Sequence, residues 1–339
     1  MAARIITYRE AIREAIQSEM RRDPSVILIG EDIAGGASTH LEVEGQDAWG
    51  GELGVTKGLV QEFGRERVRD APISESAFIG AAVGAAATGL RPIAELMFVD
   101  FLGVCLDQIF NQGGKLRYMF GGKAKVPLVI RTVYGAGARG AAHHSATLYS
   151  VFAHMPGLKV VVPSTPANAK GLLTAAIRDD DLVIFLEHLM LFDLAGPVPA
   201  GDYMIPLGKA EIARPGKDMT VVAIGRMRVF ALQAAEQLAE NNIDVEVIDP
   251  LSLSPLDEST ILESLKKTHR LVVVDEDNPR CSLASDIVAL AAQKALFYLD
   301  SAPQMVTAPH TPVPFSPPLE DAYIPSPAKI VTAIKATIA

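Results

Sequence analysis

The sequence predicts an α/β protein of two domains, each built on a parallel β-sheet that helices cover. Apolar runs of strand length alternate with amphipathic helical segments along most of the chain, and this is the order expected when helices connect parallel strands. The composition agrees, because 49% of the residues are hydrophobic, only 6% are aromatic and 27 are glycine. A chain of 339 residues is also long enough for two cores of ordinary size.

The first domain is expected to span residues 1–190. Hydrophobic periodicity and turn residues define its elements. In chain order we expect a helix at 8–23, a strand at 26–30, an irregular glycine-rich loop at 35–51, a helix at 56–63, a strand near Val68, a helix at 76–89, a strand at 93–96, a long helix at 101–119, a strand at 127–130, a Gly/Ala loop at 135–142, a strand at 159–162, a helix at 166–178 and a strand at 182–187.

A linker at residues 191–205 is predicted next, because Pro197, Pro199 and nearby Gly and Asp residues interrupt the periodicity. The second domain then spans residues 206–339. Its expected elements are a strand at 219–225, a helix at 230–241, a strand at 245–248, a helix at 257–267, a strand at 271–275, a helix at 283–297, a proline-rich surface segment at 308–318 and a final helix at 326–338.

Charge and cysteine content exclude several classes of function. The net charge of −9 is spread along the chain, with no basic stripe for nucleic acid and no polybasic segment for an anionic membrane. Cys105 and Cys281 lie far apart without metal-ligand spacing, which indicates a reducing compartment. We expect a cytoplasmic protein, because neither a signal peptide nor an apolar run of membrane-spanning length is recognised.

Glu75 is the most informative residue. It precedes a run of small uncharged residues at 77–89, so it opens an apolar helix that can pack closely against another backbone. A carboxylate there is costly unless something pairs with it. The segment alone leaves two interpretations open: a buried catalytic carboxyl group, or a carboxylate that the helix dipole favours at a helix start.

Ordered motifs along nearly the whole chain favour the catalytic interpretation. The chain resembles the beta subunits of the thiamine-diphosphate-dependent first component of acetoin and 2-oxo acid dehydrogenase complexes, which combine a transketolase-like pyrimidine domain with a transketolase C-terminal-like domain. The matching motifs include Gly30-Glu31-Asp32, Pro72-Ile73-Ser74-Glu75, Tyr118-Met119-Phe120-Gly121-Gly122, His144-Ser145 and Pro156-Gly157-Leu158-Lys159. Residues 279–282 and 306–315 look most like the acetoin-cleaving branch.

The resemblance implies roles for four residues of the first domain. Glu75 stands where the family's glutamate shares a proton with the ring nitrogen of the cofactor's aminopyrimidine. Phe101 stands where an aromatic ring packs against that pyrimidine, although by itself it would be assigned to the core. Ile73 and Glu31 belong to the expected cofactor-binding set. Glu31 and Asp32 follow a predicted strand, where α/β sheets place ligand-facing groups, but a helix cap or a buried acceptor is an equal alternative.

His144 is the second expected catalytic residue. It follows the Gly/Ala loop and matches a family histidine suited to proton transfer, usually in Gln-His-Ser-Gln. Here the sequence is His143-His144-Ser145-Ala146, so both glutamines are replaced and the substrate contacts change. His143 is either a second polar contact or an exposed residue.

A potassium site is a further implication of the resemblance. Some family members hold the ion near a charged turn that here follows residue 178, although a charged turn after a helix is the commoner explanation of such a sequence. The matching positions are Leu128, Ala176, Ile177, Asp179 and Asp181, the last often asparagine in relatives.

The family's diphosphate and magnesium anchor, Gly-Asp-Gly followed by asparagine, does not occur in the 339 residues. The resemblance therefore implies that an alpha subunit holds Mg²⁺ and the diphosphate in an alpha2beta2 heterotetramer, which docks on a dihydrolipoyl acyltransferase core and its lipoyl domain.

The expected reaction is oxidative cleavage of acetoin with acetyl transfer to lipoamide, and the alternative is oxidative decarboxylation of pyruvate or a branched 2-oxo acid. A self-sufficient transketolase-like enzyme lacks support because the anchor is missing. A non-catalytic assembly subunit is disfavoured because Glu75, Phe101 and His144 are retained.

Overall fold

The computed structural model describes residues 4–35 and 50–338, so most of the glycine-rich loop expected at 35–51 lies outside the described residues. The chain divides into two compact units. The first contains Met1–Val133, Phe152–Glu187 and Leu191–Leu207, and the second contains Tyr134–Val151, His188–Met190 and Gly208–Ala339. Because both units draw on separate stretches of the chain, each is described by itself.

A parallel sheet forms the centre of the first unit. Its strands lie in the order β6-β7-β5-β4-β2-β3, and the neighbours β6/β7, β5/β4, β4/β2 and β2/β3 pair in parallel. The strands are β2 (Val26–Glu31), β3 (Val68–Ala71), β4 (Arg91–Phe98), β5 (Val129–Tyr134), β6 (Lys159–Val161) and β7 (Val183–His188). The parallel sheet expected for this part of the chain is confirmed.

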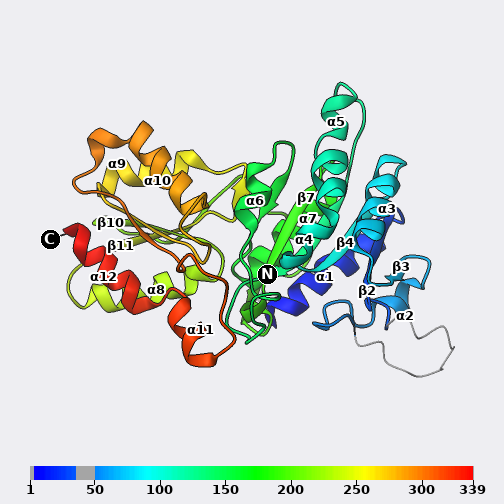
Figure 1. Ribbon diagram of the computed structural model, residues 1–339, viewed down its shortest axis with the longest axis horizontal. Coiled ribbons are helices and arrows are strands. Elements are labelled where there is room, and N and C mark those ends of the chain that lie inside the picture. Colours follow the sequence, from blue (N-terminus) through cyan, green and yellow to red (C-terminus); the bar gives the residue numbers. More distant parts are fainter. Residues whose placement is uncertain (1–3, 36–49, 339) are drawn as a thin grey trace. The chain divides into compact units, whose positions relative to one another are not determined.

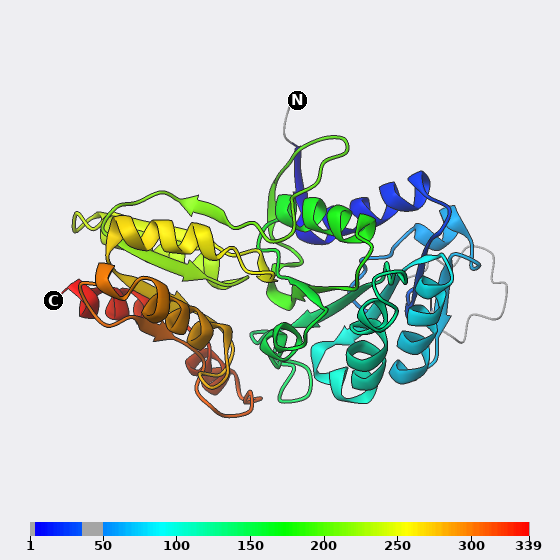
Figure 2. The ribbon, with the colours of Figure 1, turned by 90° about the horizontal axis from the view of Figure 1, so that it is seen from above.

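Helices cover both faces of this sheet, as Figure 2 shows. One face carries α1 (Tyr8–Arg22) and α7 (Pro166–Arg178), and the other carries α3 (Glu75–Ala87) and α4 (Leu102–Asp107). Two of these helices begin with sequence-encoded caps. Thr7 and Glu10 form a capping box at α1, and the Thr165 side chain accepts a hydrogen bond from Asn168 N at α7, satisfying amides that lack helical partners.

The single helix expected at 101–119 is wrong. The segment contains a 3-10 turn η1 (Val99–Phe101), α4, a π-helical turn η2 (Gln108–Gly113) and α5 (Leu116–Met119). A β-carbon at Gly113 would lie 2.3 Å from Leu182 Cδ1. The Leu182 side chain therefore packs tightly against the backbone in the π-helical turn that interrupts the regular helix. The helix expected at 56–63 is also shorter, because α2 (Leu59–Phe63) begins only after Gly58, whose φ is +85°.

The segment expected as a linker contains a strand. β8 (Ala195–Val198) pairs antiparallel with β1 (Arg4–Thr7), even though Pro197 interrupts its pattern. Proline fits here because this sheet has only two strands, so no further strand has to use its missing N–H. The short helices η3 (Leu189–Leu191) and α6 (Tyr149–His154) were not predicted either.

The second unit has a five-stranded sheet in the order β14-β13-β10-β11-β9, parallel except at β9. Its strands are β9 (Glu211–Arg214), β10 (Met219–Ala223), β11 (Val245–Asp249), β13 (Leu271–Val274) and β14 (Gln304–Val306). Helices α8 (Met227–Ala239) and α12 (Pro327–Ile338) cover one face, and α9 (Glu258–Thr268) and α10 (Leu283–Lys294) cover the other (Figure 1).

Two separate cores follow from this arrangement of the second unit, one on each face of the sheet. Short elements were missed by sequence reasoning: β9, β14, β12 (Ser252–Ser254), η4 (Leu296–Tyr298) and α11 (Pro317–Tyr323). Within residues 4–35 and 50–338, no helix combines the length and apolar character needed to cross a membrane.

Candidate active site

A buried ion network lies across three neighbouring strands of the first unit. Arg131 on β5 is directly opposite Glu95 on β4 and donates to its Oε2 at 2.6 Å. On the other side its guanidinium donates to both carboxylate oxygens of Glu187 on β7, at 2.6 and 2.8 Å. The Arg131 and Glu187 side chains are only 2% and 1% exposed. Sequence reasoning missed this network, although each residue interrupts an apolar strand and the strand order makes them neighbours.

Glu31 ends β2 beside this network. Its side chain is buried, and its Oε1 has no hydrogen-bond partner among the described residues. Burial raises the pKa of this carboxyl group to about 7, with the negative charges of Glu75, Asp32 and Glu95 adding to the shift. Glu31 therefore holds a proton near neutral pH and keeps one oxygen free for a ligand.

Glu75 is the first residue of α3, as expected. Its side chain is buried, and it lies close enough to Glu31 for its charge to raise the Glu31 pKa. The preceding Ser74 does not cap the helix, because its hydroxyl donates to Pro72 O at 2.9 Å. The amides at the start of α3 therefore have no side-chain cap from Ser74. Glu75 and the protonated Glu31 give the site two carboxyl groups that can exchange a proton with a basic ring nitrogen.

Cys105 of α4 completes the surroundings of Glu75. Burial, together with the Glu75 charge, raises the pKa of the thiol to about 12. The thiol accordingly stays protonated at physiological pH and is a packing group rather than a nucleophile.

The two other expected cofactor contacts differ in exposure. The Phe101 ring is partly buried and packs edge-to-face against Phe98, with ring centroids 5.9 Å apart. Ile73 is 85% exposed, which is unusual for an isoleucine and leaves its side chain available to a ligand or to another chain. Glu31 and Glu75 are brought together, and Phe101 belongs to the same unit, in the turn before α4.

His144 belongs to the second unit, in the stretch Tyr134–Val151. Its side chain is exposed, as is that of His143, while the next residue, Ser145, is buried. The loop therefore exposes both histidines and buries the serine that follows them.

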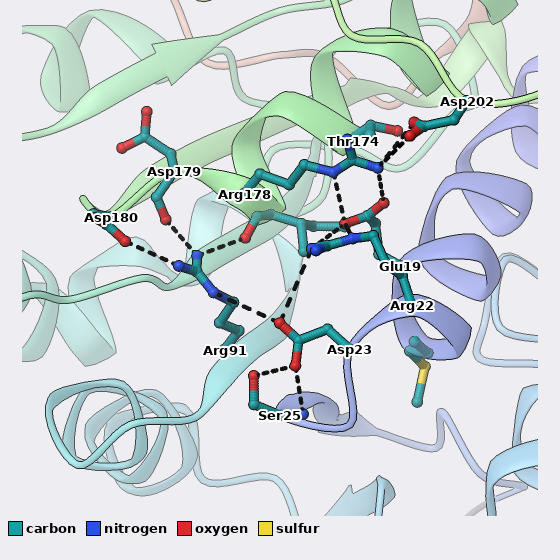
Figure 3. Close-up of polar contacts among 12 residues, drawn as sticks. Glu19, Arg22, Asp23, Ser25, Arg91, Thr174, Arg178, Asp179, Asp180 and Asp202 are labelled. Atoms are coloured by element: carbon teal, nitrogen blue, oxygen red, sulfur yellow. Dashed lines mark hydrogen bonds and ion pairs between the residues drawn. The ribbon is translucent and has the colours of Figure 1, made fainter.

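The charged turn after α7 contains cations from the chain itself. Lys159 Nζ lies 2.7 Å from both carboxylate oxygens of Asp179 and 3.1 Å from Asp181 Oδ2. Arg117 donates to Asp181 Oδ1 at 2.5 Å. Figure 3 shows Arg91 reaching the same turn, where it bonds Asp179 O at 2.8 Å and Asp180 Oδ1 at 2.9 Å.

The carbonyl oxygens expected to bind potassium are engaged too. Leu128 O accepts from Val183 N at 2.9 Å, Ala176 O from Asp179 N at 3.2 Å and Ile177 O from Arg91 at 3.0 Å. A potassium ion would compete with Arg91 for Ile177 O, and with Lys159 and Arg117 for the carboxylates of Asp179 and Asp181. The chain's own cations thus already pair with the carboxylates of this turn, and the potassium site stays a prediction.

The unpartnered Glu31 oxygen beside Glu75 does fit an aminopyrimidine, which offers a basic ring nitrogen and an exocyclic amine. Comparisons with known proteins agree with this chemistry. Residues 4–192 match the family described as "Transketolase, pyrimidine binding domain", and residues 208–330 match "Transketolase, C-terminal domain". The chain belongs to this transketolase-like family of thiamine-diphosphate enzymes, among the beta subunits of acetoin and 2-oxo acid dehydrogenases.

Among its relatives, the "Acetoin:2,6-dichlorophenolindophenol oxidoreductase subunit beta" of Bacillus subtilis is 60% identical over 97% of this chain and 96% of its own length. The protein of the same name from Cupriavidus necator is 58% identical over 99% and 98%. A "2-oxoisovalerate dehydrogenase subunit beta" of Bacillus subtilis is 40% identical over 98% of both. The solved structure "Split gene transketolase, inactive beta4 tetramer" superposes with a TM-score of 0.77 at 22% identity, covering 98% of each chain, and supports the fold alone.

Proposed function

We propose that this chain is the beta subunit of an acetoin-cleaving dehydrogenase and passes the acetyl group to lipoamide together with an alpha subunit. The observation that carries the proposal is the buried Glu31–Glu75 carboxyl pair with its unpartnered oxygen, on a fold shared with thiamine-diphosphate enzymes. The substrate assignment is supported by the two relatives named for acetoin, at 58 and 60% identity. The relative named for 2-oxoisovalerate, at 40%, makes 2-oxo acid decarboxylation the second candidate.

Thiamine diphosphate, when bound, supplies the carbon that attacks the substrate carbonyl and accepts the electrons released by cleavage. Glu75 would hold the proton at the pyrimidine ring nitrogen, and Glu31 keeps a second proton near it. Phe101 offers a flat aromatic face to the pyrimidine, and Ile73 offers an exposed aliphatic side chain. The buried Arg131 network holds β4, β5 and β7 in register behind these groups. His144 transfers a proton at the substrate oxygen or during acyl transfer.

The proposed assembly is an alpha2beta2 heterotetramer in which the alpha subunit binds the diphosphate and Mg²⁺, docked on a dihydrolipoyl acyltransferase core. The missing Gly-Asp-Gly anchor supports this division of labour. A cytoplasmic location is proposed because both cysteines, Cys105 and Cys281, are free thiols.

Substitution of Glu75 tests the mechanism. The chain is co-expressed with its alpha partner, supplied with thiamine diphosphate and Mg²⁺, and assayed by dichlorophenolindophenol reduction with acetoin, pyruvate and 2-oxoisovalerate. Glu75→Gln should lower kcat by about a thousandfold or more while the complex stays assembled, because the amide cannot supply the proton. The exposed Glu66→Gln is the matched control and should be unchanged.

Each outcome is informative. Near-normal turnover by an assembled Glu75→Gln complex would contradict the catalytic assignment. Reduction with a 2-oxo acid but not with acetoin would keep the mechanism and replace the proposed substrate.

A further inference from the structure

Four buried carboxylates of the second unit contact one loop, residues 134–151, which carries His144. We call Asp275, Glu276, Asp277 and Glu320 the carboxylate clamp. All four are at most 8% exposed. The first three follow β13 directly, and Glu320 lies in α11. Carboxylates buried to this degree are costly unless they accept hydrogen bonds, so their partners show what the cluster is built to hold.

The start of the loop is held by two of these carboxylates. Ala136 N donates to Glu276 Oε1 and Gly137 N donates to Glu320 Oε1, both at 2.7 Å. Arg139 then donates to Glu320 Oε2 at 2.7 Å. Gly137 must be glycine for this path, because its φ is +120° and a β-carbon would lie 2.9 Å from Met190 Cγ.

The end of the loop is held by the other two. The Tyr149 hydroxyl donates to Asp275, and Ser150 Oγ donates to Asp277 Oδ2 at 2.6 Å. Ser150 Oγ also accepts from Leu283 N at 3.2 Å, at the start of α10. Both ends of the loop are thus tied to the same carboxyl edge of the second unit's sheet.

His188 reinforces the first anchor. Its Nδ1 accepts from Met190 N at 3.1 Å, so the proton of the neutral ring lies on Nε2, which faces Glu276 Oε2 at 2.8 Å. Gly135 passes so close that a β-carbon would lie 2.3 Å from Nε2. The imidazole is fully buried and fills the space beneath the loop.

Between the anchors the backbone is strained. Arg139 and Ala141 have φ of +64° and +58°, a region that residues with a β-carbon adopt at a cost. Such a conformation persists only where neighbouring contacts impose it. Within the described residues, the clamp supplies those contacts on both sides of His144.

We infer that the carboxylate clamp positions His144, so that the second unit, besides any role in assembly, sets the geometry of the acid-base group. Glu320 is a positioning residue, acting through the backbone at Gly137 and the side chain of Arg139. The inference rests on the proposed function only in taking His144 as the acid-base group.

A double-mutant cycle in the assembled complex tests it. Glu320→Ala removes both acceptors, whereas Glu320→Gln keeps an acceptor for Gly137 N and should retain an intermediate activity. The neighbouring Asp321→Asn is the matched control, because Asp321 also pairs with Arg139 at 2.8 Å but its side chain is 64% exposed. Each variant is made with His144 intact and with His144→Ala, and hydrogen exchange is followed by mass spectrometry over residues 135–148.

Glu320→Ala should lower kcat about tenfold or more when His144 is present and less than about twofold when it is absent, with KM little changed. Exchange in the loop should be about tenfold faster, and Asp321→Asn should change neither quantity. An equal loss of kcat in both backgrounds, or unchanged exchange, would overturn the inference. Full activity of His144→Ala alone would instead refute the proposed role of His144, and the inference with it.

Discussion

Replacing Arg131 by methionine should destabilise the first unit strongly. The side chain is 2% exposed and makes three hydrogen bonds of 2.6 to 2.8 Å to Glu95 and Glu187. Methionine fills a similar volume but leaves two buried carboxylates uncompensated. Removing one partner of a buried ion network costs about 3 to 5 kcal/mol, a large part of the ~5 to 15 kcal/mol that stabilises a typical domain.

The pH dependence of the loss identifies its cause. Burial already raises the pKa of Glu187 beside Arg131, and in the variant, which lacks that cation, this carboxyl group should titrate well above its unfolded value near 4.3. The folded variant then binds protons that the unfolded chain has released, so its stability falls as the pH rises. The deficit relative to the parent should be larger at pH 8 than at pH 5.

Urea unfolding followed by circular dichroism at both pH values measures this deficit. Arg21→Met is the matched control, since Arg21 also pairs with a glutamate, Glu62, but its side chain is 59% exposed. The control should lose far less stability than Arg131→Met, because water screens an exposed ion pair. A loss for Arg131→Met no larger than the control, or one independent of pH, would refute the argument.

Two further predictions concern charges near the site. In the chain without added cofactor, Glu31→Gln should raise stability at pH 8 by about 1 kcal/mol, after allowance for solvent screening, and by less at pH 5. The Glu31 pKa of about 7 makes the parent lose stability as pH rises from about 4.5 through 7, and the glutamine variant avoids this loss. A stability gain of the variant that grows as pH falls would contradict this reasoning. Exchanging potassium for sodium should leave the melting temperature of the parent within about 1 °C. Lys159→Met should lower the melting temperature by several degrees, because Lys159 neutralises Asp179. A marked potassium dependence of the parent's melting temperature would show that an ion occupies the turn.

Local pattern was sufficient for much of the fold. The helix at 166–178 has its predicted bounds because Thr165, Pro166 and the apolar period act within one segment. Strands β2 and β10 were recognisable as apolar runs between turn signals. The breaks in the helix expected at 101–119 could not be recognised, because packing against Gly113 decides them. The pairing of β1 with β8 could not be recognised either, because the partner strand lies some 190 residues away in the chain.

Some features of the candidate site could likewise be predicted from the sequence, and others could not. The motif around Glu75 and the start of its helix could be read from the chain, because both depend on adjacent residues. Strand position placed Glu31 only among ligand-facing groups, and its proximity to Glu75 and its unpartnered oxygen appear only in the folded unit.

The sequence by itself therefore determined the alternation of helices and strands, the family and the identities of the acid-base candidates, since these depend on local patterns or on sequence motifs. Tertiary structure alone decided which charges meet: Glu95 with Arg131 and Glu187, Lys159 with Asp179, and Glu276 and Glu320 with the His144 loop. The physical reason is that burial and pairing of a charge depend on groups brought together across the fold, and no local pattern specifies those neighbours.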